Sequence, residues 1–159
     1  MASVSGTYSF LDVLASFAGP GASGGFDIQG MGIAAEGIKV TMNGDQDIMS
    51  IGAAGDGMHS LSASKAGRIS ITLLKTGPGN ALLNALFNYQ SQSSAYWGQN
   101  QMSVRNPVTG DSVVAQAGAF VKRPDVIYDV AGPMMVWEFN FVEIDTTLGN
   151  SYQNIAVIV

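Results

Sequence analysis

Apolar and polar residues alternate along most of the chain, a pattern typical of strands that bury one face. In one such run Ile69, Ile71 and Leu73 would point toward a core, with polar residues between them. We predict a strand in each of the runs, which are residues 7–14, 37–43, 67–75, 101–106, 112–123 and 134–145.

A hairpin is expected around residues 37–52. Ile38, Val40 and Met42 share one face of the first strand, and the turn residues Gly44 and Asp45 follow it directly. A short turn of this kind joins antiparallel neighbours. Residues 46–52 are therefore predicted to return beside residues 37–43.

One helix is predicted, at about residues 78–91. Thr76 or Gly77 can cap it, and Pro78 suits the first helical position. Its apolar stripe, at helical spacing, consists of Leu82, Leu83, Leu86 and Phe87. The opposite face carries Asn80, Asn84 and Asn88, which suit a neutral protein contact and a solvated face equally well.

The order of strands, one helix and then strands predicts a mainly β fold, because alternating βα units are absent. We expect an antiparallel β sandwich or barrel with one flanking helix, forming a single domain over residues 1–159. Three segments have no evident place in that fold. They are a Gly-rich loop at 18–34, a loop at 52–65 and an apolar C-terminal extension at 150–159.

The composition indicates a surface that meets protein more than water. Charged residues make up 12% of the chain and hydrophobic residues 47%, against about 25% charged in ordinary soluble domains. A tight oligomer or polymer explains this shortage, although a monomer covered with Ser, Thr, Asn and Gln also fits. No apolar stretch approaches the roughly 18 residues that span a bilayer.

The charge balance argues against a nucleic-acid-binding protein. The formal net charge is −5, and Lys122 and Arg123 are the only adjacent basic residues, whereas gripping phosphates takes clustered basic side chains. The aromatic residues Tyr96, Trp97 and Trp137 could stack on single-stranded bases. Without a basic groove, packing in a core or an interface explains them better.

Residues 51–65, IGAAGDGMHSLSASK, hold the residue types of an active site. His59 with Asp56 and a nearby serine would suit a hydrolase, but catalytic triads are assembled from separate elements of a fold. The glycines lack the Lys-Ser/Thr ending of a P-loop. One histidine and no cysteine leave zinc improbable, and Asp45 and Asp47 read as a solvated turn more readily than as a metal site. We expect no enzyme, cofactor or metal site.

A family resemblance is carried by YSFLDV near the start, EGIKV, IMSIGAAGDGMHS, GRISITLLKTGPGNALLNAL, a QSxSS stretch and WEFNFVEIDTTLG. Together these resemble the tail tube proteins of contractile-tailed phages, over residues 7–149. The part from Gly52 to Leu86 is the most specific. The final SYQNIAVIV departs from the family pattern.

The resemblance implies a β sandwich or barrel with one helix, six copies to a ring, and rings stacked into a hollow tube that conducts DNA into the host. Its implied partners are further copies of the chain, the tail sheath protein, the tape-measure protein, and baseplate and terminator proteins. Genomic DNA would pass without specific binding, because an acidic and neutral lumen repels phosphates. The protein would be made in the host cytoplasm and reside in the virion tail.

Two sets of residues are candidates for these roles. Polar members of the alternating strands would face the lumen: Lys39, Thr41, Ser70, Thr72, Glu138 and Asn140. Contacts between subunits are expected at Phe26, Ile28, Met31, Asp56, Met58, His59, Asn84, Asn88, Tyr152, Ile155 and Val157. A tube subunit of a phage-like bacteriocin or of a bacterial injection system fits the same residues, and a hydrolase using His59 is the alternative from another class.

Overall fold

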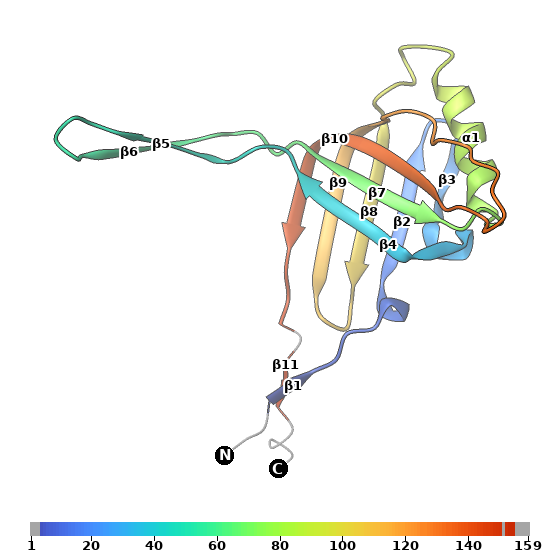
Figure 1. Cartoon of the computed structure of the whole chain (residues 1–159), viewed down its shortest axis with the longest axis horizontal. Helices are drawn as coiled ribbons and strands as arrows, with labels where there is room; N and C mark the ends of the chain where they lie inside the picture. The colour runs from blue at the N-terminus through green and yellow to red at the C-terminus, as the bar shows by residue number, and fades with distance from the viewer. Residues whose placement is uncertain (1–3, 151, 155–159) are drawn as a thin grey trace.

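The computed structural model describes residues 4–150 and 152–154 of the 159-residue chain. Its single α-helix, α1, spans Gly79–Gln90, and two 3₁₀ turns, η1 and η2, span Phe10–Asp12 and Ile28–Met31. The strands are β1 Val4–Gly6, β2 Leu14–Gly19, β3 Ala22–Asp27, β4 Ile33–Met42, β5 Asp47–Ile51, β6 Gly57–Leu61, β7 Gly67–Leu73, β8 Asn100–Asn106, β9 Asp111–Phe120, β10 Met135–Thr147 and β11 Tyr152–Asn154. The predicted mainly β fold with one helix is confirmed (Figure 1).

Seven of the strands form one antiparallel sheet in the order β3-β2-β8-β9-β10-β7-β4. Strand β10 pairs with β7 through Met135–Phe141 and with β9 through Phe139–Thr147, so the two partners overlap on only a short central segment. The sheet folds over along this strand, and β4 and β7 cross in front of β2, β3, β8 and β9 (Figure 1). In the described residues the order ends at β3 and β4, so the sheet resembles a sandwich and does not close into a barrel.

The core lies between the two halves of the folded sheet. The expected inward residues Ile69, Ile71 and Leu73 are fully buried there. Trp137, Phe139 and Phe141 of β10 are buried opposite them, in contact with rings from the other half such as Phe17 and Phe120. Burying a large apolar side chain contributes about 1.5–3 kcal/mol, so β10 supplies much of the stability of the fold.

Helix α1 covers one end of this core with Leu83 and Leu86, while Leu82 is partly exposed. The helix begins one residue later than predicted, because Pro78 occupies the N-cap position and makes no side-chain cap. Asn80 makes the local connections instead. Its Nδ2 donates to the carbonyl oxygen of Leu74 at 2.8 Å, and its Oδ1 accepts from Trp137 Nε1 at 3.0 Å.

Three predicted segments are wrong in detail. Residues 7–14 contain the turn η1, and the strand begins only at Leu14. The Gly-rich stretch 18–34 is not a loop, because β3 and η2 lie within it. Residues 46–52 do not return beside 37–43. Strand β4 pairs with β7, with Ile38 opposite Ile71, and β5 pairs with β6.

The two ends of the described chain meet below the sheet, where β11 pairs with β1 through Tyr152 opposite Gly6 and Asn154 opposite Val4 (Figure 1). Part of the predicted C-terminal extension therefore pairs with the N-terminal segment. Ile155 and Val157 lie outside the described residues. None of the helices in the described part of the chain is long and apolar enough to cross a membrane.

Candidate functional site

The most distinctive feature of the molecule is an arm, residues 43–66, that projects from the body between β4 and β7 (Figure 1). Strands β5 and β6 form its outer part, with Met49 opposite His59. The turn at the tip is closed by the Gly52 amide, which donates to the Asp56 carbonyl oxygen at 2.7 Å. The expected loop at 52–65 is thus wrong, since only the tip and the base of this segment lack strand structure.

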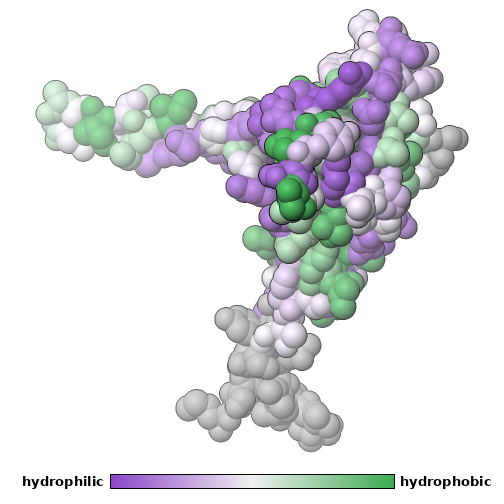
Figure 2. All heavy atoms as spheres, turned by 45° about the vertical axis from the view of Figure 1, so that its right-hand side comes forward, coloured by the Kyte–Doolittle hydropathy of each residue, from purple (hydrophilic) through white to green (hydrophobic). Residues whose placement is uncertain are grey.

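The arm exposes large apolar side chains on both of its faces. Because neighbours along a strand alternate in direction, the register places Met49, Ile51 and Leu61 on one face and Ile48 and Met58 on the other. These five residues are between 59% and 87% exposed. Figure 2 shows several strongly hydrophobic side chains along the arm, away from the body. Apolar exposure gathered on one projecting element indicates a binding surface.

His59 lies on this arm and does not form the constellation of a hydrolase. Its Nδ1 is 2.9 Å from Asp47 Oδ2 and not beside Asp56. The His59 side chain is 71% exposed, and the adjacent Ser60 points to the other face of the strand. A catalytic base needs a nucleophile within hydrogen-bond reach. The geometry here is that of an exposed cross-strand pair.

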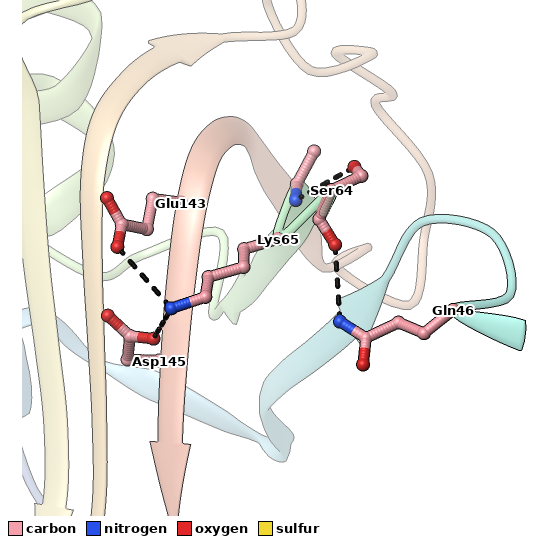
Figure 3. Close-up of polar contacts among 6 residues, drawn as sticks. Gln46, Ser64, Lys65, Glu143 and Asp145 are labelled. Atoms are coloured by element: carbon pink, nitrogen blue, oxygen red, sulfur yellow. Dashed lines mark hydrogen bonds and ion pairs between the residues drawn. The ribbon is translucent and has the colours of Figure 1, made fainter. Parts of the chain in front are cut away.

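One side of the arm's base is attached to β10 (Figure 3). The Ile144 amide donates to the Lys65 carbonyl oxygen at 2.9 Å, and Lys65 Nζ lies 3.1 Å from Asp145 Oδ1 and 3.9 Å from Glu143 Oε1. The hydrogen bond that Lys65 donates to Asp145, and then the negative charges of Asp145 and Glu143, raise the pKa of Lys65. Lys65 therefore keeps its positive charge throughout the neutral range.

The six residues predicted to face a lumen share one face of β4, β7 and β10. The sheet register aligns Lys39 with Ser70 and Ser70 with Glu138, and on the next row it aligns Thr41 with Arg68 and Arg68 with Asn140. Thr72 lies on the same face opposite Val136. It is only 9% exposed, so it contributes little surface.

This polar face carries basic side chains beside the acidic and neutral groups that we expect of a lumen. Arg68 Nη1 lies 3.2 Å from Glu138 Oε2, and Arg68 Nε donates to Asn140 Oδ1 at 3.2 Å. Lys39 is exposed and, within the described residues, forms no ion pair. The face thus carries one compensated ion pair and one free cation.

The candidate intersubunit residues fall into different environments. Ile28 and Met31 are buried in the core of their own chain, which withdraws them from any contact with a second copy. Phe26 is half-buried, and its ring packs at a tilt against the core ring of Phe17, with the two centroids 5.2 Å apart. Asn84 is exposed on α1. Four further candidates also have exposed side chains: Asp56, Met58, His59 and Asn88.

Asn88 has a partner in its own chain, since its Oδ1 accepts a hydrogen bond from Arg123 Nη2. Tyr152 lies in β11, whose backbone pairs with β1. The sequence reasoning omitted Ile48, Met49, Ile51 and Leu61, all of them exposed on the arm. The first three lie in the predicted returning strand and Leu61 in the predicted loop 52–65, so the sequence pattern does not mark them as exposed. No group of acidic residues and histidine that could hold a metal ion is found in the described part of the chain.

The overall fold is similar to that of chains in several solved tail and injection-system structures. One is from the tail of an empty GTA particle with C6 symmetry (14% identity, TM-score 0.59, covering 89% of this chain and 98% of that one). A second is from an extracellular contractile injection system, the PVC sheath–tube complex in its extended state (11% identity, TM-score 0.55, covering 94% and 93%). A third is from the anti-feeding prophage tube-terminating cap (9% identity, TM-score 0.56, covering 92% and 95%). A search of curated proteins returned no match.

An open antiparallel sheet folded into two layers and one flanking helix thus define the fold that this chain shares with these structures. The sequence pattern of the bacteriophage PhiTE tail tube protein family matches residues 5–149. The chain belongs to this family. The predicted resemblance is confirmed, and the family consists of structural proteins and not of enzymes.

Proposed function

We propose that this protein assembles into hexameric rings that stack into the hollow tube of a contractile phage tail, and that DNA passes through the tube into the host. Family membership supports the tube, and the C6 symmetry of the GTA tail supports six copies per ring. The single observation that carries the proposal is the apolar arm, which projects from a folded body and has both faces exposed.

The arm requires a partner for physical reasons. An isolated two-stranded hairpin is marginally stable in water, and this one leaves five large apolar residues exposed. A neighbouring subunit that covered them would stabilise the assembly by about 1.5–3 kcal/mol for each side chain fully buried. In a ring the contact is heterologous, so the arm meets a different surface of the next subunit. Asp56, Met58 and His59 would then lie in an interface, as the sequence predicted.

The polar face of β4, β7 and β10 is our candidate for the lumen. Its ion pair between Arg68 and Glu138 is internally neutral and leaves Lys39 as the free charge on that face. One free cation per subunit gives a translocating duplex little to bind, because tight phosphate binding takes clusters of basic residues. Under this proposal DNA passes without specific binding because this face is nearly neutral. The sequence had led us to expect repulsion of DNA by an acidic and neutral lining.

The proposal includes the partners of a tail. Related tube structures come from a sheath–tube complex, a baseplate and a sheath/tube terminator, and we propose the equivalent contacts for this chain in a virion. A tape-measure protein inside the tube and synthesis in the host cytoplasm belong to the same proposal. The exposed asparagine Asn84 on α1 offers an uncharged contact surface for one of these partners.

Electron microscopy of the purified protein tests the assembly. Rings or tubes of six-fold symmetry are expected from the parent chain. The double variant Ile48→Ser/Met58→Ser removes the apolar residues from one face of the arm and should abolish tubes while leaving the melting temperature of the subunit unchanged. The His59→Ala variant, which alters the arm without removing apolar surface, should still form tubes. A parent chain that stays monomeric at high concentration would contradict the proposal.

A second candidate is the tube of an injection system or of a phage-like bacteriocin. The similarity to the PVC tube and to the anti-feeding prophage cap favours it as a specific alternative. Particles isolated from the producing cells distinguish the two. Tails joined to DNA-filled heads support the phage assignment, whereas headless particles support the alternative.

A further inference from the structure

The arm leaves the body in a defined direction although its two legs, residues 43–46 and 62–66, hold mainly to each other. The Asn43 amide donates to the Ala66 carbonyl oxygen at 2.9 Å, and the Ser62 amide donates to the Gln46 carbonyl oxygen at 2.7 Å. Gln46 Nε2 adds a bond to the Ser64 carbonyl oxygen at 3.2 Å (Figure 3). These bonds hold the two legs side by side, but they do not set the angle between the arm and the sheet.

The attachment that can set the angle is made by Lys65. Its carbonyl oxygen accepts a hydrogen bond from the Ile144 amide, and its ammonium group reaches Asp145 and Glu143, the residues on either side of Ile144. Ile144 is buried, so the flanking Glu143 and Asp145 project from the outer surface of a strand fixed in the core. The ammonium group thus binds carboxylates whose backbone cannot move freely.

We propose that Lys65, held by Asp145 and Glu143, is a positioning residue that fixes the direction of the arm in the free subunit, so that it is preorganised for its neighbour. The inference rests on the proposed function only in taking a second copy of the chain as the arm's partner. Preorganisation reduces the entropy that a flexible segment loses on binding.

An exposed ion pair adds little to the stability of a folded chain. A small difference in free energy is enough to select one orientation of the arm among several, because the populations of the orientations depend exponentially on that difference. The arrangement therefore suits an orienting role better than a stabilising one. It also holds the apolar residues of the arm away from apolar side chains exposed on the body, such as Val136 and Val142.

The orientation can be measured directly, because the chain contains no cysteine. Spin labels on Ala54→Cys in the arm's turn and Ala85→Cys on α1 occupy exposed positions on two separate parts of the molecule. Double electron–electron resonance gives the distribution of distances between the two labels. It is recorded on dispersed subunits diluted with unlabelled protein. The Lys65→Met variant should broaden the distance distribution at least twofold, whereas Lys65→Arg and the control Lys122→Met should keep the parent width.

Charge reversal makes the test specific. Lys65→Glu should broaden the distribution, and adding Asp145→Lys should narrow it again. An unchanged width in Lys65→Met, or no narrowing in the double variant, overturns the inference. Circular dichroism melting of each variant confirms that the subunit is folded. The distances are measured without tubes, so a parent chain that forms none would contradict the proposed function and leave this result standing.

Discussion

The side-chain amides of Gln90 and Asn100 bind each other twice in the interior, where neither residue contacts solvent. Gln90 Nε2 donates to Asn100 Oδ1 at 2.7 Å, and Asn100 Nδ2 donates to Gln90 Oε1 at 2.9 Å. Gln90 Nε2 also donates to the Pro20 carbonyl oxygen at 2.9 Å. Gln90 ends α1 and Asn100 begins β8, so the pair joins the helix to the sheet and to the β2–β3 turn.

Breaking this amide pair should destabilise the subunit. Asn100→Ala leaves polar atoms of Gln90 buried without their partner, which costs about 1–3 kcal/mol of unfolding free energy. Gln90→Ala should cost a similar amount. The double variant should cost less than the sum, because the second substitution removes the group that the first left unpaired. Urea denaturation measures all three, and strictly additive losses would contradict the coupling.

Two asparagines of α1, Asn80 and Asn84, should behave differently when each is replaced by alanine. Asn80→Ala removes the acceptor of Trp137 Nε1 and the donor to the Leu74 carbonyl oxygen, so we expect a loss of about 1–3 kcal/mol. Asn84→Ala, on an exposed position, should change stability by less than about 0.5 kcal/mol. Thermal melting compares the two, and equal effects would contradict the structural role of Asn80.

Gly67 should not tolerate alanine. A Cβ atom there would lie 2.6 Å from Ile144 Cδ1 and 2.7 Å from the Thr41 carbonyl oxygen, whereas a Cβ atom at Gly30 would meet nothing within 4 Å. We expect Gly67→Ala to cost about 1–3 kcal/mol through overpacking, and Gly30→Ala to be nearly neutral. Denaturation midpoints measured side by side test this. A neutral Gly67→Ala would mean that β4 and β10 can separate at the base of the arm.

Ionisation of Tyr89 should respond to Tyr96. The two rings stack with centroids 5.0 Å apart. The side-chain hydrogen bond of the Tyr89 hydroxyl with Tyr96, followed by the charge of Tyr96, raises the pKa of Tyr89 above 10.0. The stabilisation from this contact is complete below pH 10.0 and is lost as the pH rises through the higher folded-state value. Nuclear magnetic resonance of ring-labelled tyrosine should show the Tyr89 pKa falling toward 10.0 in Tyr96→Phe.

Deleting residues 152–159 should remove the partner of β1. Because the β1–β11 pair lies outside the seven-stranded sheet, the melting temperature of the isolated subunit should change little. If the C-terminal extension contacts other subunits, the tubes should become shorter and less stable to heat. Electron microscopy measures tube length, and light scattering measures tube melting. If both are unchanged, the extension makes no contact between subunits.

Local periodicity predicted the elements that bury one face. Ile69, Ile71 and Leu73 lie inward as expected, and α1 occupies nearly its predicted range. In these segments the alternation of apolar residues fixes which side chains are buried. A shift of the strand register by one residue would turn each apolar side chain toward solvent. The polar residues of the same strands accordingly share one face.

The arm could not be predicted for a related reason. Residues 47–51 (DIMSI) are mainly apolar, as in a strand of the body, and nothing in a single sequence says whether their apolar residues face a core or a neighbouring molecule. The pairing of β4 with β7 bridges the whole arm, whereas the turn signal at Gly44 favoured a local hairpin. For the Gly-rich segment 18–34 the error was the reverse. A loop was expected there, whereas its Ile28 and Met31 are buried in the core.

The double pairing of β10 has a consequence for the timing of synthesis. This strand joins the two layers of the sheet, yet at residues 135–147 it is the last in sequence of the seven strands. The arm, by contrast, is a local hairpin that can form as soon as residue 61 has emerged. A nascent chain on the ribosome therefore lacks the body that would present its arm. Under the proposed function, a chain whose synthesis has not passed residue 147 would not yet be able to join a growing tube.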